Sequence, residues 1–279
     1  MRSSAWAQRR WFRRLAALAA AVAVSVLMLV LMDSQVRTPV GAAGAGRGSF
    51  PVVEVAGLGS DGSGFRALTA RLQAEGVTVL DLDPDQAGTQ PLVYRPDDDE
   101  DVADLAVRVV APAIDAALAR AGLDPDQEVD VVAHSTGGLL VRYLVEHPVP
   151  TSGASWAERV DDLVMVGVPN HGSDVVYWET RRGPLRALGA DMRPGSDLLT
   201  GLGTTEPPGE VYTAIGGDPW LFRWYRHGDH GFDDQVPTES VFMDGAALDT
   251  FASFHGRILD NDDALDLITA TLRAGDPAH

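Results

Sequence analysis

The strongest local pattern in the chain is the stretch Ala133-His134-Ser135-Thr136-Gly137-Gly138. It follows a predicted buried strand, Val129 to Ala133, and it opens a predicted helix. A serine flanked by small residues at such a junction is typical of a sharp turn that holds a nucleophile in a strained conformation. An ordinary serine helix cap would explain the junction but not the two glycines. The stretch therefore predicts a nucleophilic Ser135, with the Thr136 N–H at the helix start able to donate to an oxyanion.

From Ser49 onward, apolar strand-like runs alternate with helical patterns. The predicted strands cover residues 52–56, 77–82, 129–133, 163–168, 211–215 and 241–243. Predicted helices lie between them, and a last one runs from Ala264 to Leu272. An acidic run, Asp97 to Asp101, opens a long helix that Pro112 should kink or break. This alternation predicts a mainly parallel sheet with helices on both faces, in one domain over residues 49–279.

The composition limits the possible partners. The formal net charge is −18, the chain has no lysine, and five of its arginines precede the first apolar run. The rest of the chain is therefore more acidic still, and we expect no nucleic-acid partner for it. The absence of cysteine excludes disulfides, thiolate catalysis and cysteine metal sites.

The N-terminus predicts export. Residues 15–32 carry no charge and follow the arginine-rich start, and eighteen residues are about the shortest helix that crosses a bilayer. Residues 1–32 are therefore interpreted as a signal anchor that inserts in the membrane with its arginines inside. A signal peptide cleaved near Ala43-Gly44-Ala45 is the alternative. Residues 33–48 form a Gly/Ala-rich linker, and either version places the domain outside the cytoplasm.

A nucleophilic serine needs a base and an acid. Among seven histidines, His255 is the best base, because it lies in a Phe-His-Gly turn between the last predicted strand and the final helix. His134 adjoins the serine, and its side chain should point away from the nucleophile. The acid should lie between Ile215 and the last strand. Spacing alone does not separate the four candidates, which are Asp218, Asp229, Asp233 and Asp234.

Several segments together resemble the bacterial lipase/esterase branch of the α/β-hydrolases. They are the stretch around Ser135, Val168 to Ser173, Asp191 to Leu199, Asp233 to Pro237 and His255 to Leu259. They occur in the expected order and span roughly residues 50 to 272. The resemblance implies the α/β-hydrolase fold with a lid-like insertion. It also assigns the acid to Asp233, although Asp234 replaces the glycine of the usual Asp-Gly-x-Val-Pro pattern and stays an alternative.

The resemblance further implies a mechanism. Such lipases carry His-Gly after the first core strand, and the next residue donates an oxyanion N–H. This chain has Ala56-Gly57-Leu58, so Leu58 takes that place beside Thr136. Ser135 would attack a carboxylic ester or lipid, with His255 as base and Asp233 orienting it, and no cofactor is required. An acyltransferase with the same triad is the nearest alternative, and the sequence does not predict the oligomeric state.

Other interpretations compete with the hydrolase. Gly57-Leu58-Gly59-Ser60-Asp61-Gly62 fits a dinucleotide-binding fingerprint, with Asp81 or Asp83 near the position of a ribose-binding acid. That oxidoreductase interpretation leaves the stretch around Ser135 unexplained. A non-catalytic, membrane-anchored binding protein is supported only by the missing histidine of the His-Gly pair. Residues 227–234 hold possible metal ligands, but no spacing enforces a geometry, so we predict no metal site there.

Overall fold

The computed structural model describes residues 50–97, 99–150, 153–182, 185–206, 211–219 and 231–274. The predicted anchor, residues 1–32, and the linker, residues 33–48, lie outside them. So does the segment 220–230, which contains Asp229. Within the described part of the chain, no helix combines the length and apolar character needed to cross a membrane.

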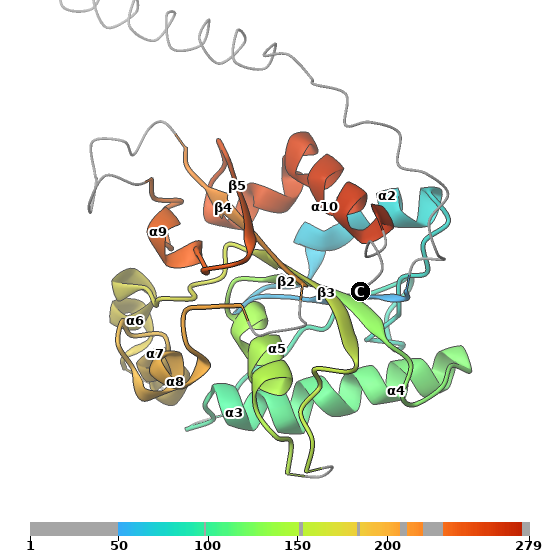
Figure 1. Cartoon of the computed structure of the whole chain (residues 1–279), viewed down its shortest axis with the longest axis horizontal. Helices are drawn as coiled ribbons and strands as arrows, with labels where there is room; N and C mark the ends of the chain where they lie inside the picture. The colour runs from blue at the N-terminus through green and yellow to red at the C-terminus, as the bar shows by residue number, and fades with distance from the viewer. Residues whose placement is uncertain are drawn as a thin grey trace, which may run out of the picture. The chain divides into compact units, whose positions relative to one another are not determined.

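A five-stranded parallel sheet forms the centre of the domain (Figure 1). Its strands adjoin one another in chain order: β1 (Val52–Val55), β2 (Val129–His134), β3 (Val160–Val166), β4 (Val211–Gly217) and β5 (Ala247–Phe251). Strands β1, β2 and β3 are largely apolar, because both faces of the sheet are buried there.

Helices cover both faces of this sheet, as predicted. On one side lie α2 (Arg66–Ala74) and α10 (Asp262–Ala274), and on the other α3 (Val102–Leu105), α4 (Ala111–Ala121) and α5 (Thr136–Glu146) (Figure 1). Alternate strand residues divide between the two cores. Val131 packs with the α5 side and Val132 with the α10 side. The predicted α/β fold class is therefore confirmed.

Short elements fill the connections. The insertion between β3 and β4 contains α6 (Asp174–Thr180), α7 (Arg186–Asp191) and α8 (Asp197–Leu202), grouped together in Figure 1. The fully buried Arg142 of α5 joins this insertion to the domain. Its guanidinium donates to the Leu202 carbonyl at 3.1 Å and to Asn170 Oδ1 at 3.0 Å, and it pairs with Glu146 at 2.8 Å.

Two predicted strands are wrong. In the segment 77–82, only Val79 forms an isolated parallel bridge, to Val52, although Val77, Leu80 and Leu82 are buried. The predicted strand 241–243 begins at the last residue of a short helix, α9 (Thr238–Val241), and the true last strand is β5. Every residue of β5 is exposed or half-buried, so it lacks the apolar pattern that marks the inner strands.

Pro112 does not end its helix. The residues before it form a π-helical turn, η2 (Ala106–Val110), between α3 and α4. Proline has no N–H for the carbonyl one turn earlier, and a wider turn accommodates that loss. Asp101 caps the start of this helical stretch by accepting the Asp104 N–H at 2.8 Å.

Candidate active site

Ser135 occupies the turn between β2 and α5. Its backbone angles, φ 54° and ψ −132°, fall outside the usual regions for a residue with a side chain. The glycines that follow are needed for packing. A Cβ on Gly137 would lie 2.6 Å from the Ala56 carbonyl oxygen, and one on Gly138 would lie 2.2 Å from a methyl of Val168. The sheet and the helix therefore hold the serine in a conformation that it would not adopt alone.

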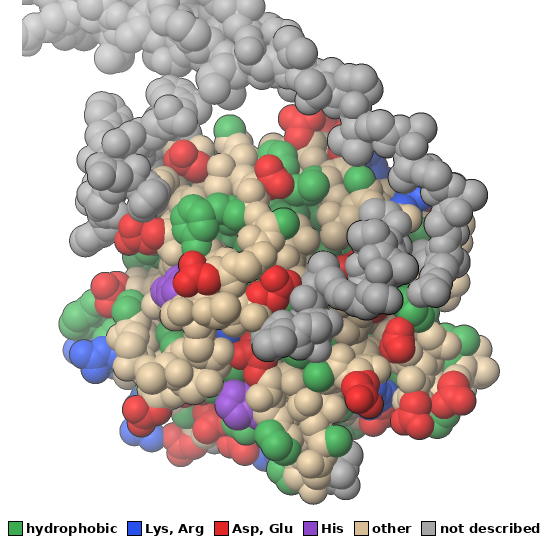
Figure 2. Space-filling view, viewed as in Figure 1, with side chains coloured by type: hydrophobic (Ala, Val, Ile, Leu, Met, Phe, Trp, Pro, Cys, Tyr) green, Lys and Arg blue, Asp and Glu red, His purple; other side chains and the backbone are tan. Residues whose placement is uncertain are grey.

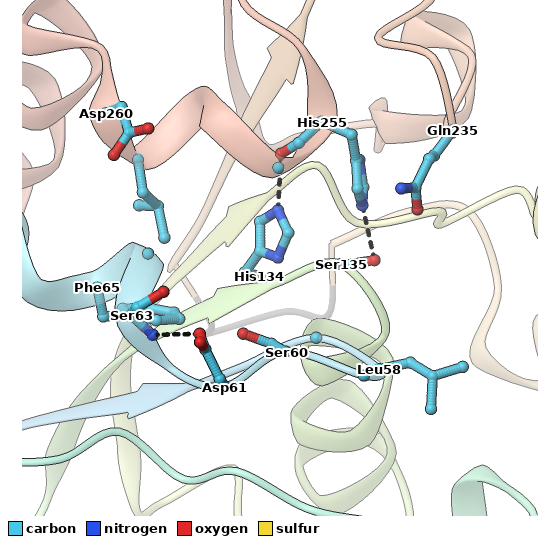
Figure 3. A pocket seen from close by; sticks show the side chains of 15 residues that line it. Leu58, Ser60, Asp61, Ser63, Phe65, His134, Ser135, Gln235, His255 and Asp260 are labelled. Carbon is cyan, nitrogen blue, oxygen red and sulfur yellow. Dashed lines mark hydrogen bonds between the residues drawn. The ribbon is translucent and has the colours of Figure 1, made fainter.

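The structure brings the three residues of the predicted triad together. His255 Nε2 lies 2.9 Å from Ser135 Oγ, and His255 Nδ1 lies 2.8 Å from Asp233 Oδ2. All three side chains are buried. Figure 3 shows the His255 ring, from the short helix η4 (His255–Asp260), reaching the serine hydroxyl. The arrangement can pass a proton from the serine to the imidazole and stabilise the resulting charge.

The loop around Asp233 is built to hold a carboxylate. Asp233 Oδ1 accepts the backbone N–H groups of Gln235, at 3.0 Å, and Val236, at 2.6 Å. Its carbonyl oxygen accepts the His255 N–H at 2.7 Å. These bonds leave Oδ2 aimed at the imidazole, so the loop fixes both the Asp233 carboxylate and the backbone of His255.

The other candidate acids are placed differently. Asp234 is exposed, and its φ of 86° is the left-handed conformation that the usual glycine adopts without strain. Its Oδ1 accepts the His255 backbone N–H at 3.2 Å instead of contacting the ring. Partial loss of hydration raises the pKa of Asp234. Asp218 is half-buried beside Gly231, and its N–H donates to the Phe251 carbonyl.

A cavity of about 350 Å³ opens above the serine. It is lined by the loop that follows β1, by His134 and His255, and by Gln235 (Figure 3). Leu58 lies on this loop, and Thr136 is the first residue of α5, where an N–H has no partner within the helix. Both predicted oxyanion donors therefore belong to segments that adjoin Ser135.

Each glycine of the dinucleotide-like fingerprint has a local structural reason, either close packing or a positive φ. A Cβ on Gly57 would lie 2.8 Å from the Ser135 Cβ, and one on Gly62 would lie 2.8 Å from the Pro91 ring. Gly59 and Gly62 both have positive φ. The close approach of Gly57 to Ser135, the contact of Gly62 with Pro91 and the positive φ of Gly59 together account for the pattern.

His134 is the residue that the sequence left without a role. Its side chain lies on the same face of β2 as Val132, as strand alternation requires, and it contacts the base. The His134 ring lies 4.8 Å from the His255 ring, and its Nε2 donates to the His255 carbonyl at 3.0 Å. Burial, and then the neighbouring His255, lower the pKa of His134 to about 4. A neutral His134 therefore holds the backbone of His255 through this hydrogen bond.

Known proteins resemble this chain more in fold than in sequence. A family described as a domain of unknown function, DUF7379, matches residues 108–180, a span that includes Ser135. No curated protein matches the sequence. The mature lipase BlEst2 of Bacillus licheniformis superposes with a TM-score of 0.61 at 16% identity, over 82% of this chain and 94% of that one.

Two further structures are similar. Phospholipase PlaB of Legionella pneumophila superposes with a TM-score of 0.59 at 17% identity, over 82% of this chain, which spans 60% of PlaB. EstA of Clostridium botulinum superposes with a TM-score of 0.56 at 10% identity, over 85% of this chain and 90% of EstA. The chain thus has the α/β-hydrolase fold found in bacterial and fungal lipases and esterases.

Proposed function

We propose that this protein is a serine hydrolase that cleaves carboxylic esters. One observation supports the proposal above all others: the unbroken hydrogen-bonded series Ser135–His255–Asp233 at the floor of an open cavity. Strain at the serine and a backbone-bonded acid add to it, because neither is needed for a stable strand–helix turn.

In the proposed reaction, Ser135 Oγ attacks the ester carbonyl while His255 Nε2 takes the hydroxyl proton. The carbonyl carbon becomes tetrahedral, and its oxygen takes up negative charge between the N–H groups of Leu58 and Thr136. The imidazolium then gives its proton to the leaving alcohol as the C–O bond breaks. The imidazole then takes a proton from water as the water oxygen attacks the acyl-serine, and it returns that proton to Ser135 Oγ as the acyl C–O bond breaks and the acid leaves.

The surroundings of His255 suit this cycle. Asp233 holds the proton on Nδ1, which leaves Nε2 free to accept from the serine, and its negative charge stabilises the imidazolium. Because the pKa of His134 is about 4, this neighbour stays neutral at neutral pH. A second positive charge therefore does not oppose protonation of His255.

Ester hydrolysis tests the proposal. Wild-type protein, Ser135→Ala and a control, Ser155→Ala, would be compared on p-nitrophenyl esters of graded chain length. Ser155 is half-buried and lies outside the cavity that contains Ser135. We expect Ser135→Ala to reduce turnover by about a thousandfold or more while Ser155→Ala has no effect. Equal activity in all three proteins, or none on any ester, would contradict the proposal.

We also propose that residues 1–32 hold the domain at the outer side of a membrane. The arginine-rich start and the uncharged segment 15–32 support this orientation. The full-length protein should fractionate with membranes and be accessible to external protease, and deletion of residues 1–48 should release it. Full-length protein in the cytosolic fraction would contradict the proposal.

A further inference from the structure

A cluster of three acids lies near the amino ends of two strands, whereas Ser135 follows the carboxyl end of β2. Asp130 is the second residue of β2, and Asp161 and Asp162 are the second and third residues of β3. One carboxylate oxygen from each lies within 4.8 Å of the other two. Ser135 follows the far end of β2, roughly 16 Å along an extended strand from Asp130. The cluster is therefore separate from the catalytic residues.

A β-bulge allows the three carboxylates to converge. Val129 is opposite Val160, whereas Val131 is opposite Leu163, so two residues of β3 stand against the single Asp130. In a regular strand, Asp161 and Asp162 would point to opposite faces of the sheet. The extra residue removes that alternation and lets both side chains approach Asp130.

One carboxylate oxygen of Asp130 is buried without a hydrogen-bond partner. The residue is 2% exposed, and its Oδ1 makes no hydrogen bond. The Asp162 backbone N–H donates to the Asp130 carboxylate, while the neighbouring Asp161 and Asp162 carboxylates are charges of the same sign. A buried carboxylate oxygen with no donor and with like charges beside it is costly, unless a proton or a cation joins the group.

We propose that Asp130, Asp161 and Asp162 bind one calcium ion. Three carboxylate oxygens within 4.8 Å of one another are close enough to share one ion, and Ca²⁺ accepts oxygen ligands in a flexible geometry that side chains fixed by a bulge can supply. The half-buried Asp161 leaves an approach for the ion and for water that completes its coordination. The ion would join β2 to β3 where the bulge interrupts their ladder and would stabilise the fold without taking part in catalysis.

The test uses calcium chloride on the full-length protein purified in detergent. Binding would be measured by titration calorimetry and stability by thermal unfolding, each against EDTA. Wild type should bind one ion and gain about 5 °C or more in Tm at saturation. Asp130→Asn should lose both the heat and the shift. The control is Asp263→Asn, an exposed acid at the start of α10, which should behave as wild type.

Three outcomes would overturn the proposal. One is the absence of saturable heat in wild type up to about 10 mM calcium, which would mean that a proton alone relieves the cluster. Another is an equal Tm shift in Asp130→Asn. The third is an equal shift from sodium chloride at matched ionic strength, which would indicate general screening of an acidic protein. Esterase activity at 25 °C should be unchanged in Asp130→Asn, so a failure here is distinct from a failure of the proposed hydrolase.

Discussion

Asp233 and Asp130 are both buried, at 0% and 2% exposure, yet their surroundings are opposite in kind. Asp233, beyond the carboxyl edge of the sheet, has two backbone N–H groups on one oxygen and the His255 ring on the other. Asp130, at the amino edge, has an oxygen without a donor and two carboxylates beside it. The first environment gives both carboxylate oxygens a hydrogen-bond partner, whereas the second leaves a buried oxygen without one beside two further carboxylates.

Burial alone therefore does not identify the role of an acid in this protein. The hydrogen-bond donors around the carboxylate distinguish one role from the other. Surface charge does not single out either site, since carboxylates are scattered over the visible face of the molecule (Figure 2).

Replacing Asp233 with asparagine should affect catalysis, whereas the same change at Asp130 should affect stability. Asp233→Asn keeps the size of the side chain but removes the charge that orients and stabilises the imidazolium. We expect kcat on a soluble ester to fall on the order of ten-thousandfold with KM nearly unchanged. Asp130→Asn should keep wild-type kcat. A near-normal Asp233→Asn with a severely impaired Asp218→Asn or Asp234→Asn would move the acid to another residue.

His134 should act through the position of His255. His134→Phe keeps a ring but loses the bond to the His255 carbonyl, so kcat should fall about tenfold, consistent with one lost hydrogen bond. KM should hardly change, and His134→Gln, which retains a donor, should recover part of the loss. Equal losses in both variants, accompanied by a lower Tm, would indicate that His134 is only a packing residue.

Glu54 extends the comparison to a third buried acid. It is 0% exposed, its Oε1 has no partner, and burial raises its pKa from 4.5 to about 8. The folded protein therefore prefers the neutral carboxyl, and its contribution to the free energy of unfolding is lost as pH rises from about 5 to about 8. Glu54 changes the free energy of unfolding by at most about 1.4 kcal/mol per pH unit.

Denaturation of wild type and Glu54→Gln across this pH range measures the effect. The difference in unfolding free energy between them should shift in favour of Glu54→Gln as pH increases. A constant difference would show that Glu54 has the same charge in the folded and unfolded states.

Asp234 should be the most tolerant of the acids near the base. Asp234→Gly restores the residue that its positive φ favours, while removing a 3.2 Å acceptor for the His255 N–H. These opposing changes should leave kcat within about threefold of wild type and Tm within a few degrees. A loss comparable with that of Asp233→Asn would instead show that the two acids share the role.

The sequence predicts those parts of the molecule whose local pattern and tertiary role agree. The strand before Ser135, the glycines after it and the turn that carries His255 all have local signals, and the structure shows each element. The predicted strand 241–243 is wrong because β5 is an edge strand whose residues are exposed or half-buried, which gives no apolar run.

Contacts between distant segments are harder to predict. Neighbours in sequence, such as Asp161 and Asp162, are expected on opposite faces of a strand, and only the bulge brings both to Asp130. The hydrogen bond from His134 to His255 joins residues 121 positions apart. A single sequence contains no signal for either contact.

Covalent labelling reveals whether Ser135 is an activated nucleophile. The full-length protein would be treated with a fluorophosphonate, digested, and mapped by mass spectrometry. We expect one adduct, on Ser135, that forms rapidly in wild type and in Asp130→Asn, slowly in Asp233→Asn, and not at all in Ser135→Ala. An adduct on another serine, or equal labelling of Ser135→Ala, would contradict this role of Ser135.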